Sequence, residues 1–392
     1  MKYEELYKNC QAAFPDYLAM WKKLVNVDCG SRYGKGINQV AEILLAEFKK
    51  LDPHEIRLIP MKNPTEGSHL LVTFKGKGKV RILLEAHLDT VFPEGTVAQR
   101  PFQIDGDWVR GPGCADCKSG VNMMLFAMKQ LEQLGYTDYD TITCFFNGDE
   151  EIGSPDSHLL LERLAPAYDV YICCESGQEG DGIVRSRKGT SHIRLKVHGV
   201  ASHAGSAPEK GCSALMEILH QIQEMKEVEK PELGTTINFT MLQSGTAENI
   251  IPDEATAVAD VRVTAPEENK RIENAIKAIA MKPIIRGTSV DARFIVGKPP
   301  FYANPATDQM IELAEGIYGE IGKTLRIVSA GGASDANWAA SYGLVAIDGF
   351  GAVKGGKNHT PKECAQVSSV VPRMYLLSRM LLELGKRVEL PK

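Results

Sequence analysis

The sequence predicts an α/β protein in which a mixed sheet is sandwiched by helices and interrupted by a smaller inserted α+β domain. Near-continuous apolar runs at residues 141–147 and 169–174 alternate with helical patterns, which is typical of a sheet buried on both faces. From residue 187 the strands instead alternate apolar and polar side chains, as strands with one solvated face do. After Pro299-Pro300 the first pattern returns, so we predict a discontinuous larger domain of residues 1–186 and 298–392 around an insert of residues 187–297.

Periodicity and turn residues assign the individual elements in order. Apolar residues at helical spacing predict helices near residues 1–30, 37–51, 118–131, 307–318 and 372–384. Short apolar runs predict strands at residues 56–59, 69–74, 80–86, 325–328 and 345–349 in the larger domain. Gly76-Lys77-Gly78 predicts a hairpin turn between the second and third of these strands. Within the insert, strand-helix-strand-strand-helix-strand forms a complete small α/β sandwich.

Length, charge and cysteine content limit the classes of protein. The 392 residues are too many for one typical core, and 43% apolar with 24% charged residues is an ordinary globular balance. The net charge of −5 and the lack of a basic run make nucleic acid an unexpected partner. We also expect no signal peptide and no membrane span. Nine cysteines, an odd number, predict reduced thiols in a cytoplasmic protein rather than a disulfide framework.

Acidic and imidazole side chains repeatedly follow the predicted strands. They are His87 and Asp89, residues 149–151 (DEE), Glu175 and His359, and Asp116 stands at the start of a helix. Sites in open α/β sheets form beyond the carboxyl ends of the strands, so we expect these side chains to share one edge of the sheet. Imidazole and carboxylate are the ligands that zinc takes in sites that stay open to water.

Each of these residues taken alone has a simpler interpretation. A single His near a strand end is more often a hydrogen-bonded surface residue, and the Glu150-Glu151 pair suits the first turn of a helix. Asp116 could be only a helix cap. Several carboxylates at one edge, however, repel each other unless a cation lies among them. The joint placement therefore predicts a divalent metal centre.

Four motifs together carry a family resemblance. They are residues 87–93 (HLDTVFP), 111–116 (GPGCAD), 149–154 (DEEIGS) and 201–205 (ASHAG). In this order they resemble the dinuclear zinc amidohydrolases of the glutamate carboxypeptidase, aminoacylase and succinyl-diaminopimelate desuccinylase family. Residues 91–96 (VFPEGT) favour the glutamate carboxypeptidase branch. The resemblance covers nearly the whole chain and implies a zinc-aminopeptidase-like fold with a ferredoxin-like lid domain, through which the family usually forms homodimers.

The resemblance also implies a role for each motif residue. It assigns one zinc to His87 and Glu175, the other to Glu151 and His359, the bridge to Asp116, orientation of His87 to Asp89, and the general base to Glu150. A water between two zincs is acidified toward neutrality and becomes the nucleophile. Two adjacent acids on one turn do not easily ligate the same ion, so one can take the proton and later pass it to the leaving amine.

The inserted domain would contribute the remaining contacts. The resemblance implies that His203 stabilises the oxyanion in the partner subunit's site and that Asn249 and Arg262 contact substrate. The alternatives are a turn histidine without function and a strand-surface ion pair of Arg262 with Asp260 or Glu254. Outside the insert, residues 331–335 (GGASD) resemble the family's glycine-rich loop, which implies that the amides of Gly331 and Gly332 approach the terminal carboxylate of the substrate.

Two features depart from the family pattern. Cys114 and Cys117 flank Asp116 where neither is an expected ligand, so we interpret them as bystanders, with sensitivity to oxidation as a hypothesis. Lys298 stands where the glutamate-specific branch tends to carry arginine, and Lys188 is another possible carboxylate contact. Strict glutamate specificity therefore does not follow from the sequence.

These observations predict a metallo-carboxypeptidase that uses two Zn²⁺ ions, with Co²⁺ or Mn²⁺ as alternatives. It would hydrolyse an amide bond and release a C-terminal amino acid, with glutamate as one candidate, from a small peptide or N-acyl amino acid. An N-acyl-amino-acid deacylase with the same machinery is the alternative enzyme. A non-catalytic metal-binding homologue is a further alternative, against which Glu150 argues, because a structural site needs no base.

Overall fold

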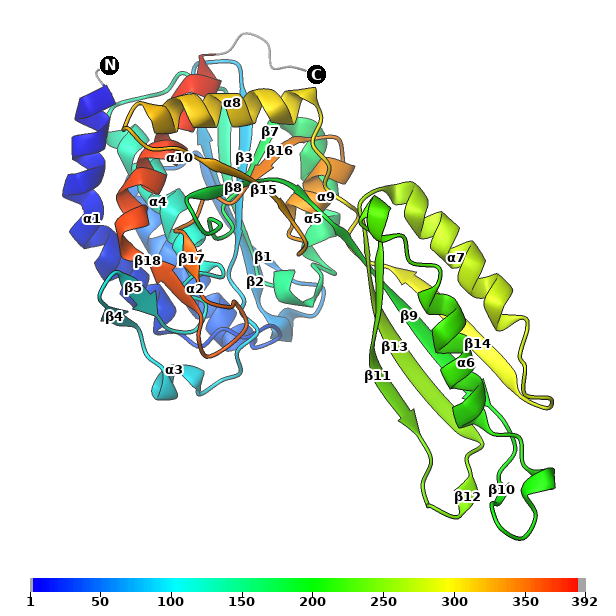
Figure 1. The fold of residues 1–392 in the computed structure, drawn as a ribbon. Coiled ribbons are helices and arrows are strands. Elements are labelled where there is room, and N and C mark those ends of the chain that lie inside the picture. Colours follow the sequence, from blue (N-terminus) through cyan, green and yellow to red (C-terminus); the bar gives the residue numbers. More distant parts are fainter. Residues whose placement is uncertain (1–2, 387–392) are drawn as a thin grey trace. The chain divides into compact units, whose positions relative to one another are not determined.

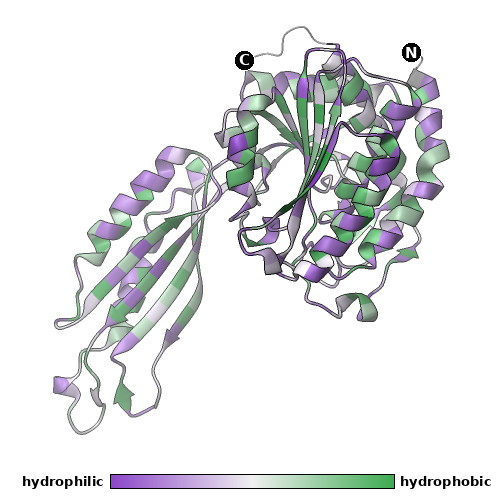
Figure 2. Cartoon of the chain, turned by 180° about the vertical axis from the view of Figure 1, so that it is seen from behind, coloured by the Kyte–Doolittle hydropathy of each residue, from purple (hydrophilic) through white to green (hydrophobic). Residues whose placement is uncertain are grey.

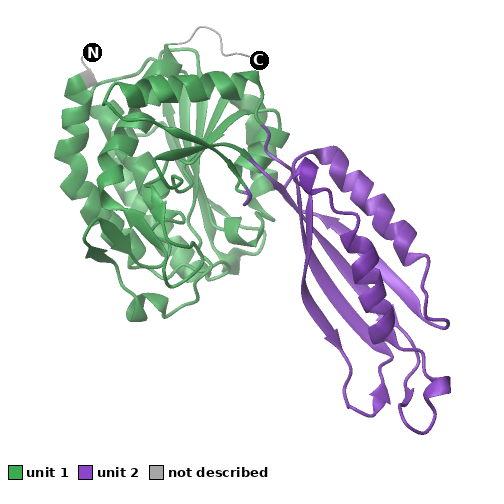
Figure 3. Ribbon diagram, in the orientation of Figure 1, with its two compact units in different colours: residues 1–186, 303–330, 334–392 green, residues 187–302, 331–333 purple. Residues whose placement is uncertain are grey.

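The computed structural model describes residues 3–386, in two compact units (Figures 1 and 3). The first unit comprises residues 1–186, 303–330 and 334–392, and the second comprises residues 187–302 and 331–333. The predicted domain bounds also include residues 1–2 and 387–392, which lie outside the described part of the chain.

The first unit is built on a mixed eight-stranded sheet. The central strands β6, β3, β7 and β16 are parallel, whereas β2 is antiparallel to both β1 and β6. Every residue of β6 is buried, which explains its predominantly apolar sequence. The order across the sheet is β1 (Glu55–Pro60), β2 (Ser68–Lys75), β6 (Thr141–Asn147), β3 (Arg81–His87), β7 (Val170–Cys173), β16 (Val345–Asp348), β8 (Gly182–Arg187) and β15 (Arg326–Ala330).

Helices cover this sheet, as predicted. Helix α4 (Lys118–Gln133) is buried along most of its length, between β3 and the helices α1 (Tyr3–Val25) and α10 (Val370–Gly385). The other helices are α2 (Gly34–Phe48) on β2, α8 (Pro305–Gly319) on α10 and β16, α9 (Ala336–Ser341) on β7 and β16, α5 (Ser157–Leu164) on α9, and the short α3 (Thr96–Gln99).

The predicted hairpin at Gly76-Lys77-Gly78 is wrong. Strand β6 lies between β2 and β3, so the two strands joined by this turn are not neighbours. The backbone N–H groups of Gly76 and Gly78 instead donate to the carbonyls of Asp140 and Tyr139, at 2.9 and 2.8 Å, in the segment that leads into β6. Strand β6 is buried throughout, so its backbone N–H and C=O groups need partner strands on both edges, and pairing with β2 and β3 supplies them.

The second unit is a ferredoxin-like sandwich. Its antiparallel sheet has the order β11-β13-β9-β14, with two helices on one face. Strands β9 and β13 alternate buried and more exposed side chains, and Figure 2 shows the resulting stripes of hydrophobic and hydrophilic residues. The elements are β9 (Gly189–His198), β10 (Ser202–His203), α6 (Ala214–Lys226), β11 (Thr236–Ser244), β12 (Ile250–Ile251), β13 (Glu254–Val263), α7 (Pro266–Ala280) and β14 (Ser289–Val296).

The helices and the cysteines of the structure bear on the expectations about membrane spans and disulfides. None of the helices described is long and apolar enough to cross a membrane. All nine cysteines are free thiols, and eight of them are buried. Burial of these thiols places them in the cores of the protein, and their reduced state stays a prediction.

A close helix–strand contact in the first unit gives a test of the fold. A Cβ added at Gly120 in α4 would overlap the carbonyl oxygen of Cys174, so Gly120→Ala should lower the free energy of unfolding by about 3 kcal/mol. Gly316 in α8 is the control, because it is exposed and its added Cβ would meet nothing within 4 Å. Gly316→Ala should instead stabilise by about 0.5–1 kcal/mol, from helix propensity. Urea unfolding measures the free energy of unfolding of both variants. Equal changes in the two variants would contradict the close contact of Gly120 with Cys174.

Candidate metal centre

The carboxyl ends of three parallel strands deliver the first part of the site. His87 is the last residue of β3 and Glu175 follows β7 by two positions. Beyond β6, the 3₁₀ turn Glu150–Ile152 carries Glu150 and Glu151. Because these strands are adjacent and parallel, side chains that are distant in sequence meet at one edge of the sheet.

A small second sheet delivers the rest. Strand β5 (Trp108–Arg110) pairs with β18 (Cys364–Gln366), and β4 (Gln103–Asp105) and β17 (Lys354–Gly355) complete this sheet. The loop after β5 contains Asp116 and the loop before β18 contains His359. The pairing of β5 with β18 thus brings together two residues that are 243 positions apart.

The five predicted metal-ligating side chains meet around Asp116. His87 Nε2 lies 3.0 Å from Asp116 Oδ1 and 3.4 Å from Glu175 Oε1. His359 Nε2 lies 3.1 Å from Asp116 Oδ2 and 3.1 Å from Glu151 Oε2. Each oxygen of Asp116 therefore faces one imidazole–carboxylate pair, which is an arrangement suited to bridging two ions.

Asp89 connects both halves of this cluster. Its Oδ1 and Oδ2 accept the backbone N–H groups of Glu150 and Glu151 at 3.1 and 3.2 Å, and Ser31 Oγ donates to Oδ2 at 2.6 Å. The backbone carbonyl of Asp89 lies 2.9 Å from His87 Nδ1, whereas its carboxylate is 3.5 Å away. The carbonyl accepts a hydrogen bond from protonated Nδ1 and so orients the ring of His87 with Nε2 directed at Asp116.

Burial and proximity shift the ionisation of the cluster. Burial favours the neutral form of Asp116, but hydrogen bonds from His359 and His87 outweigh it and lower the pKa of this carboxyl. Hydrogen bonds to Asp116 and Glu151 raise the pKa of His359 to about 11. Burial, together with the charge of Asp116, raises the pKa of Glu151 to about 8. Without an ion, protons on the imidazoles and on Glu151 therefore balance the crowded negative charge.

The residues fit a divalent metal centre. Glu151 Oε1 is buried without a hydrogen-bond partner, so this oxygen is able to bind a metal ion. His87, Asp116 and Glu151 offer ligand atoms that all lie within 4.8 Å of one another. Neutral imidazoles and ionised carboxylates are ligands for zinc and similar ions, which would take over the role of the protons.

Two residues that hold Asp116 were missed from the sequence. Glu363 Oε1 accepts the backbone N–H groups of Ala115 and Asp116 at 3.0 and 3.1 Å. Asn358 Nδ2 donates to Asp116 Oδ2 at 2.8 Å. Both belong to the loop that carries His359, and this proximity in sequence is the only signal that could have indicated them. Burial and the nearby Asp116 raise the pKa of Glu363 to about 7.

The loop that carries Asp116 also rests on helix α1. Lys118 Nζ is buried and donates to the carbonyls of Val25, Val27 and Pro112, at 3.4, 2.8 and 3.4 Å. Trp21 Nε1 donates to the carbonyl of Cys114 at 3.0 Å. The C-terminal part of α1 and the residues that follow it therefore form hydrogen bonds with the loop that carries Asp116.

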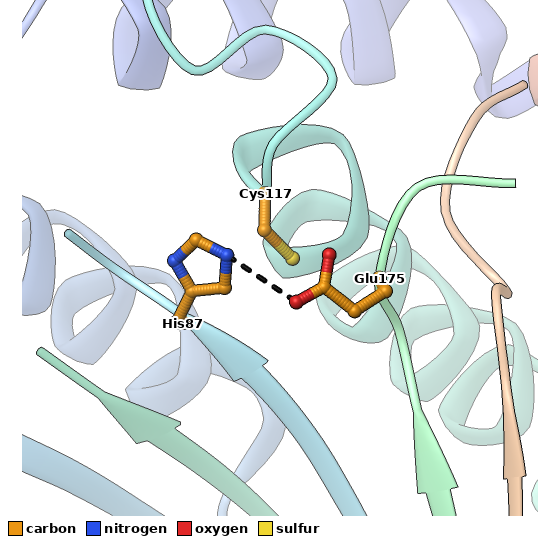
Figure 4. A group of neighbouring side chains, drawn as sticks. All are labelled: His87, Cys117 and Glu175. Carbon is orange, nitrogen blue, oxygen red and sulfur yellow. Dashed lines mark ion pairs between the residues drawn. The ribbon is translucent and has the colours of Figure 1, made fainter. Parts of the chain in front are cut away.

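The structure gives the positions of the two cysteines that flank Asp116. The sulfur of Cys117 points between the His87 ring and the Glu175 carboxylate (Figure 4), and the ligand atoms of the three residues lie within 4.8 Å of one another. The interpretation of Cys117 as a bystander stays a prediction, although its thiol lies beside two of the predicted ligands. Cys114, in contrast, directs its thiol at the carbonyl of Val109, at 3.5 Å.

The predicted residues of the second unit fall into two groups. His203 pairs with Ile250 in the β10–β12 ribbon, and the N–H of Ala204 donates to the carbonyl of Asn249, so His203 and Asn249 are neighbours. His203 is exposed, and its Nδ1 accepts the N–H groups of residues 205 and 206, both at 3.1 Å. That leaves the ring proton on Nε2, where it can be donated to a ligand.

Arg262 lies toward the other end of the same unit. Its guanidinium forms a two-pronged ion pair with Asp260, at 2.8 and 2.9 Å, which is the alternative that the sequence left open. Gly331 and Gly332 are exposed, and a Cβ at either would meet no atom within 4 Å. The carbonyl of Gly332 accepts a hydrogen bond from Arg187 at 3.0 Å.

A cavity of about 390 Å³ in the first unit is lined by one predicted ligand, Glu151. Ser31 and Thr90, which flank Asp89 in space and in sequence, also line it. Tyr33 and Glu94 belong to the same lining, and Tyr33 donates a hydrogen bond to Glu94 at 2.7 Å.

With this geometry established, comparison with known proteins is decisive. The model of peptidase family M20/M25/M40 matches residues 83–383. The chain belongs to this family. The chain is also 31% identical over 373 residues to carboxypeptidase G2 of Pseudomonas sp. (strain RS-16), covering 95% of this chain and 90% of the relative. The family assignment makes the protein a metallopeptidase that hydrolyses amide bonds.

Solved structures show the same fold. Aminopeptidase PepT of Bacillus cereus superposes with a TM-score of 0.78 at 23% identity, over 94% of this chain and 98% of that one. A Bacillus subtilis M20 peptidase described as dinuclear and metal-binding has a TM-score of 0.69 at 13% identity, over 96% and 99% of the chains. The mixed sheet with an inserted ferredoxin-like unit is therefore a shared architecture.

The ionisation of the cluster predicts how the metal-free protein responds to pH. The pKa values of Glu151 and His359 are raised in the folded state to about 8 and about 11, so folded protein holds more protons than unfolded protein between about pH 5 and 9. The unfolding free energy of the chelator-treated protein should fall as pH rises through this window. Stabilisation by added Zn²⁺ should grow over the same window, because fewer protons compete for the ligands.

Thermal unfolding with chelator or with Zn²⁺ at pH 6, 7 and 8 tests this expectation. An excess of Zn²⁺ of a hundred times its Kd adds about 2.7 kcal/mol. A zinc-dependent increase in Tm that stays constant or shrinks with rising pH would contradict the assignment of these ligands.

Proposed function

We propose that the protein is a dinuclear zinc carboxypeptidase that releases a C-terminal amino acid from a small peptide or N-acyl amino acid. The observation that carries this proposal is the position of Asp116 between two imidazole–carboxylate pairs, with Glu150 next to the ligand Glu151 on one turn. The similarity to carboxypeptidase G2 and to a dinuclear metal-binding peptidase supports it.

The proposed chemistry divides the work between the ions and the chain. Two divalent ions, when bound, would supply the Lewis acidity that activates water and polarises the amide carbonyl. His87 and Glu175 would hold one of them and Glu151 and His359 the other, with Asp116 between them. Glu150 accepts the proton of the attacking water and passes it to the leaving amine. Asp89 keeps Glu150 in register with the ligands, because it binds the backbone N–H groups of both Glu150 and Glu151.

Substrate recognition is assigned to the second unit. A guanidinium binds a carboxylate through two hydrogen bonds, and Arg262 already forms that arrangement with Asp260. A substrate carboxylate would compete with Asp260 or share Arg262 with it. The exposed amides of Gly331 and Gly332 would provide further donors.

A homodimer would bring the two ends of this unit to one substrate. Eight residue steps along β13 separate Glu254 from Arg262, which is roughly 27 Å, and the ribbon with His203 and Asn249 lies at the Glu254 end. A single amino acid cannot span that distance. If His203 and Arg262 contact the same substrate, they come from two subunits.

Exposed apolar side chains support a subunit contact on the second unit. Strand β11 is an edge of its sheet and exposes Met241 and Leu242, with relative accessibilities of 56% and 45%. Helix α6 exposes Met216 and Leu219. An unpaired edge strand with apolar side chains is a suitable surface for a second copy of the chain.

The nine free thiols further support a location in the reducing cytoplasm.

The role of Glu150 gives the central test of function. Glu150→Gln should keep two bound zinc ions per chain and lower kcat by about 10²- to 10⁴-fold, because the positioned base is lost. The assay is hydrolysis of glutamyl, aspartyl, dipeptide and N-acetyl amino acid substrates, with and without chelator. Glu94→Gln is the control, since Glu94 is a carboxylate that accepts a hydrogen bond from Tyr33 and is none of the proposed ligands. Wild-type turnover by Glu150→Gln would refute the mechanism, and cleavage of N-acetyl substrates alone would favour a deacylase.

The proposed dimer has its own test. Met241→Lys with Leu242→Lys should convert the dimer to monomers in sedimentation experiments and lower turnover by at least tenfold, while zinc content stays unchanged. Ile295→Lys on the opposite edge strand, β14, is the matched control, because Ile295 is 42% exposed. A wild-type chain that sediments as a monomer at assay concentrations and is fully active would exclude the contribution of a partner.

A further inference from the structure

The thiol of Cys117 occupies a position that the proposed mechanism leaves unused. Figure 4 shows its sulfur directed between His87 and Glu175, and the three ligand atoms lie within 4.8 Å of one another. All three residues are buried. His87 Nε2 and Glu175 Oε1 are 3.4 Å apart, so the sulfur completes a compact triangle of nitrogen, oxygen and sulfur donors.

The backbone holds this sulfur in place from two sides. Cys117 directly follows Asp116 and precedes α4, and its Sγ donates to the carbonyl of Cys174 at 3.3 Å. Cys174 immediately precedes Glu175, so the thiol is tied to the strand end that delivers a ligand. Gly120 lets α4 approach the same carbonyl, because any Cβ there would overlap it.

We propose that Cys117 is a thiolate ligand of the metal ion held by His87 and Glu175. This inference rests on the proposed dinuclear centre and adds a donor to one of its two positions. On binding, the thiol proton passes to solvent and a sulfur–metal bond replaces the hydrogen bond to Cys174.

The distances allow this ligation with little movement. Around a tetrahedral zinc, bond lengths of about 2.3 Å to sulfur and 2.0–2.1 Å to nitrogen place the two ligand atoms roughly 3.6 Å apart. A spacing of up to 4.8 Å therefore requires a shift of about 1 Å, which rotation of one short side chain supplies.

The two metal positions would then differ in chemistry. The position at His87 and Glu175 contains sulfur and favours thiophilic ions such as Zn²⁺ and Cd²⁺ over Mn²⁺. The position at Glu151 and His359 has only nitrogen and oxygen donors among the side chains described. A centre with two such different positions would bind one soft and one hard ion together with higher affinity than a centre with two equivalent positions.

Zinc-edge X-ray absorption on the wild-type protein with two bound zinc ions tests the ligand directly. The expected result is a sulfur shell at about 2.3 Å with an occupancy near one sulfur for every two zinc ions. A spectrum with nitrogen and oxygen shells alone would refute the inference while leaving the dinuclear centre intact. Failure of the protein to bind two ions would instead refute the proposed centre.

Cobalt substitution in variants provides a second measurement. Wild-type protein and Cys114→Ser, which alters a buried thiol outside the triangle, should both show thiolate-to-cobalt charge-transfer absorption in the near ultraviolet. Cys117→Ser should lack this band and bind Zn²⁺ at least roughly tenfold more weakly, since loss of an outer partner alone costs 10–100-fold. Cys117→Asp should also lack the band but gain affinity for Mn²⁺ relative to Zn²⁺. An unchanged band in either Cys117 variant would overturn the assignment.

Discussion

The site depends on one buried carboxylate that is shared by two imidazoles. Asp116 receives His87 on one oxygen and His359 on the other, and a carboxylate in such surroundings is stable only while positive charge lies beside it. The surrounding structure fixes this residue from several directions, through Glu363 on its backbone, Asn358 on its side chain and the β5–β18 pairing beneath it. The fold positions the carboxylate, and protons or metal ions then supply the opposite charge.

Local sequence was sufficient for the residues that directly follow buried strands. His87 and Glu175 could be placed at one edge because β3 and β7 are parallel, and parallel strands end on the same side. The alternation of apolar and polar residues from residue 187 indicated a different unit, and the order of its predicted elements indicated a small α/β sandwich. Its ferredoxin-like class was implied by the family resemblance.

Other features depend on contacts between distant segments and were not predictable in this way. The turn at residues 76–78 resembles a hairpin, yet the apolar β6, which comes more than sixty residues later, enters between its two strands. Glu363 and Ser31 reach the metal-ligating residues only through the pairing of separate loops. The sequence shows Cys117 only beside Asp116, whereas its sulfur lies near residues at the ends of two other strands. Sequence pattern assigns a residue to an element but does not state which side chains face it across the fold.

The buried ammonium of Lys118 has a consequence for how the protein can be shortened. The family model begins at residue 83, but two of the three carbonyls that accept from Lys118 belong to Val25 and Val27. A fragment trimmed to the matched region would keep every ligand and still leave a buried cation with one acceptor, next to the loop that carries Asp116. Uncompensated buried charges cost several kcal/mol, so the first helix, although it contributes no catalytic group, belongs to the smallest unit able to assemble the centre.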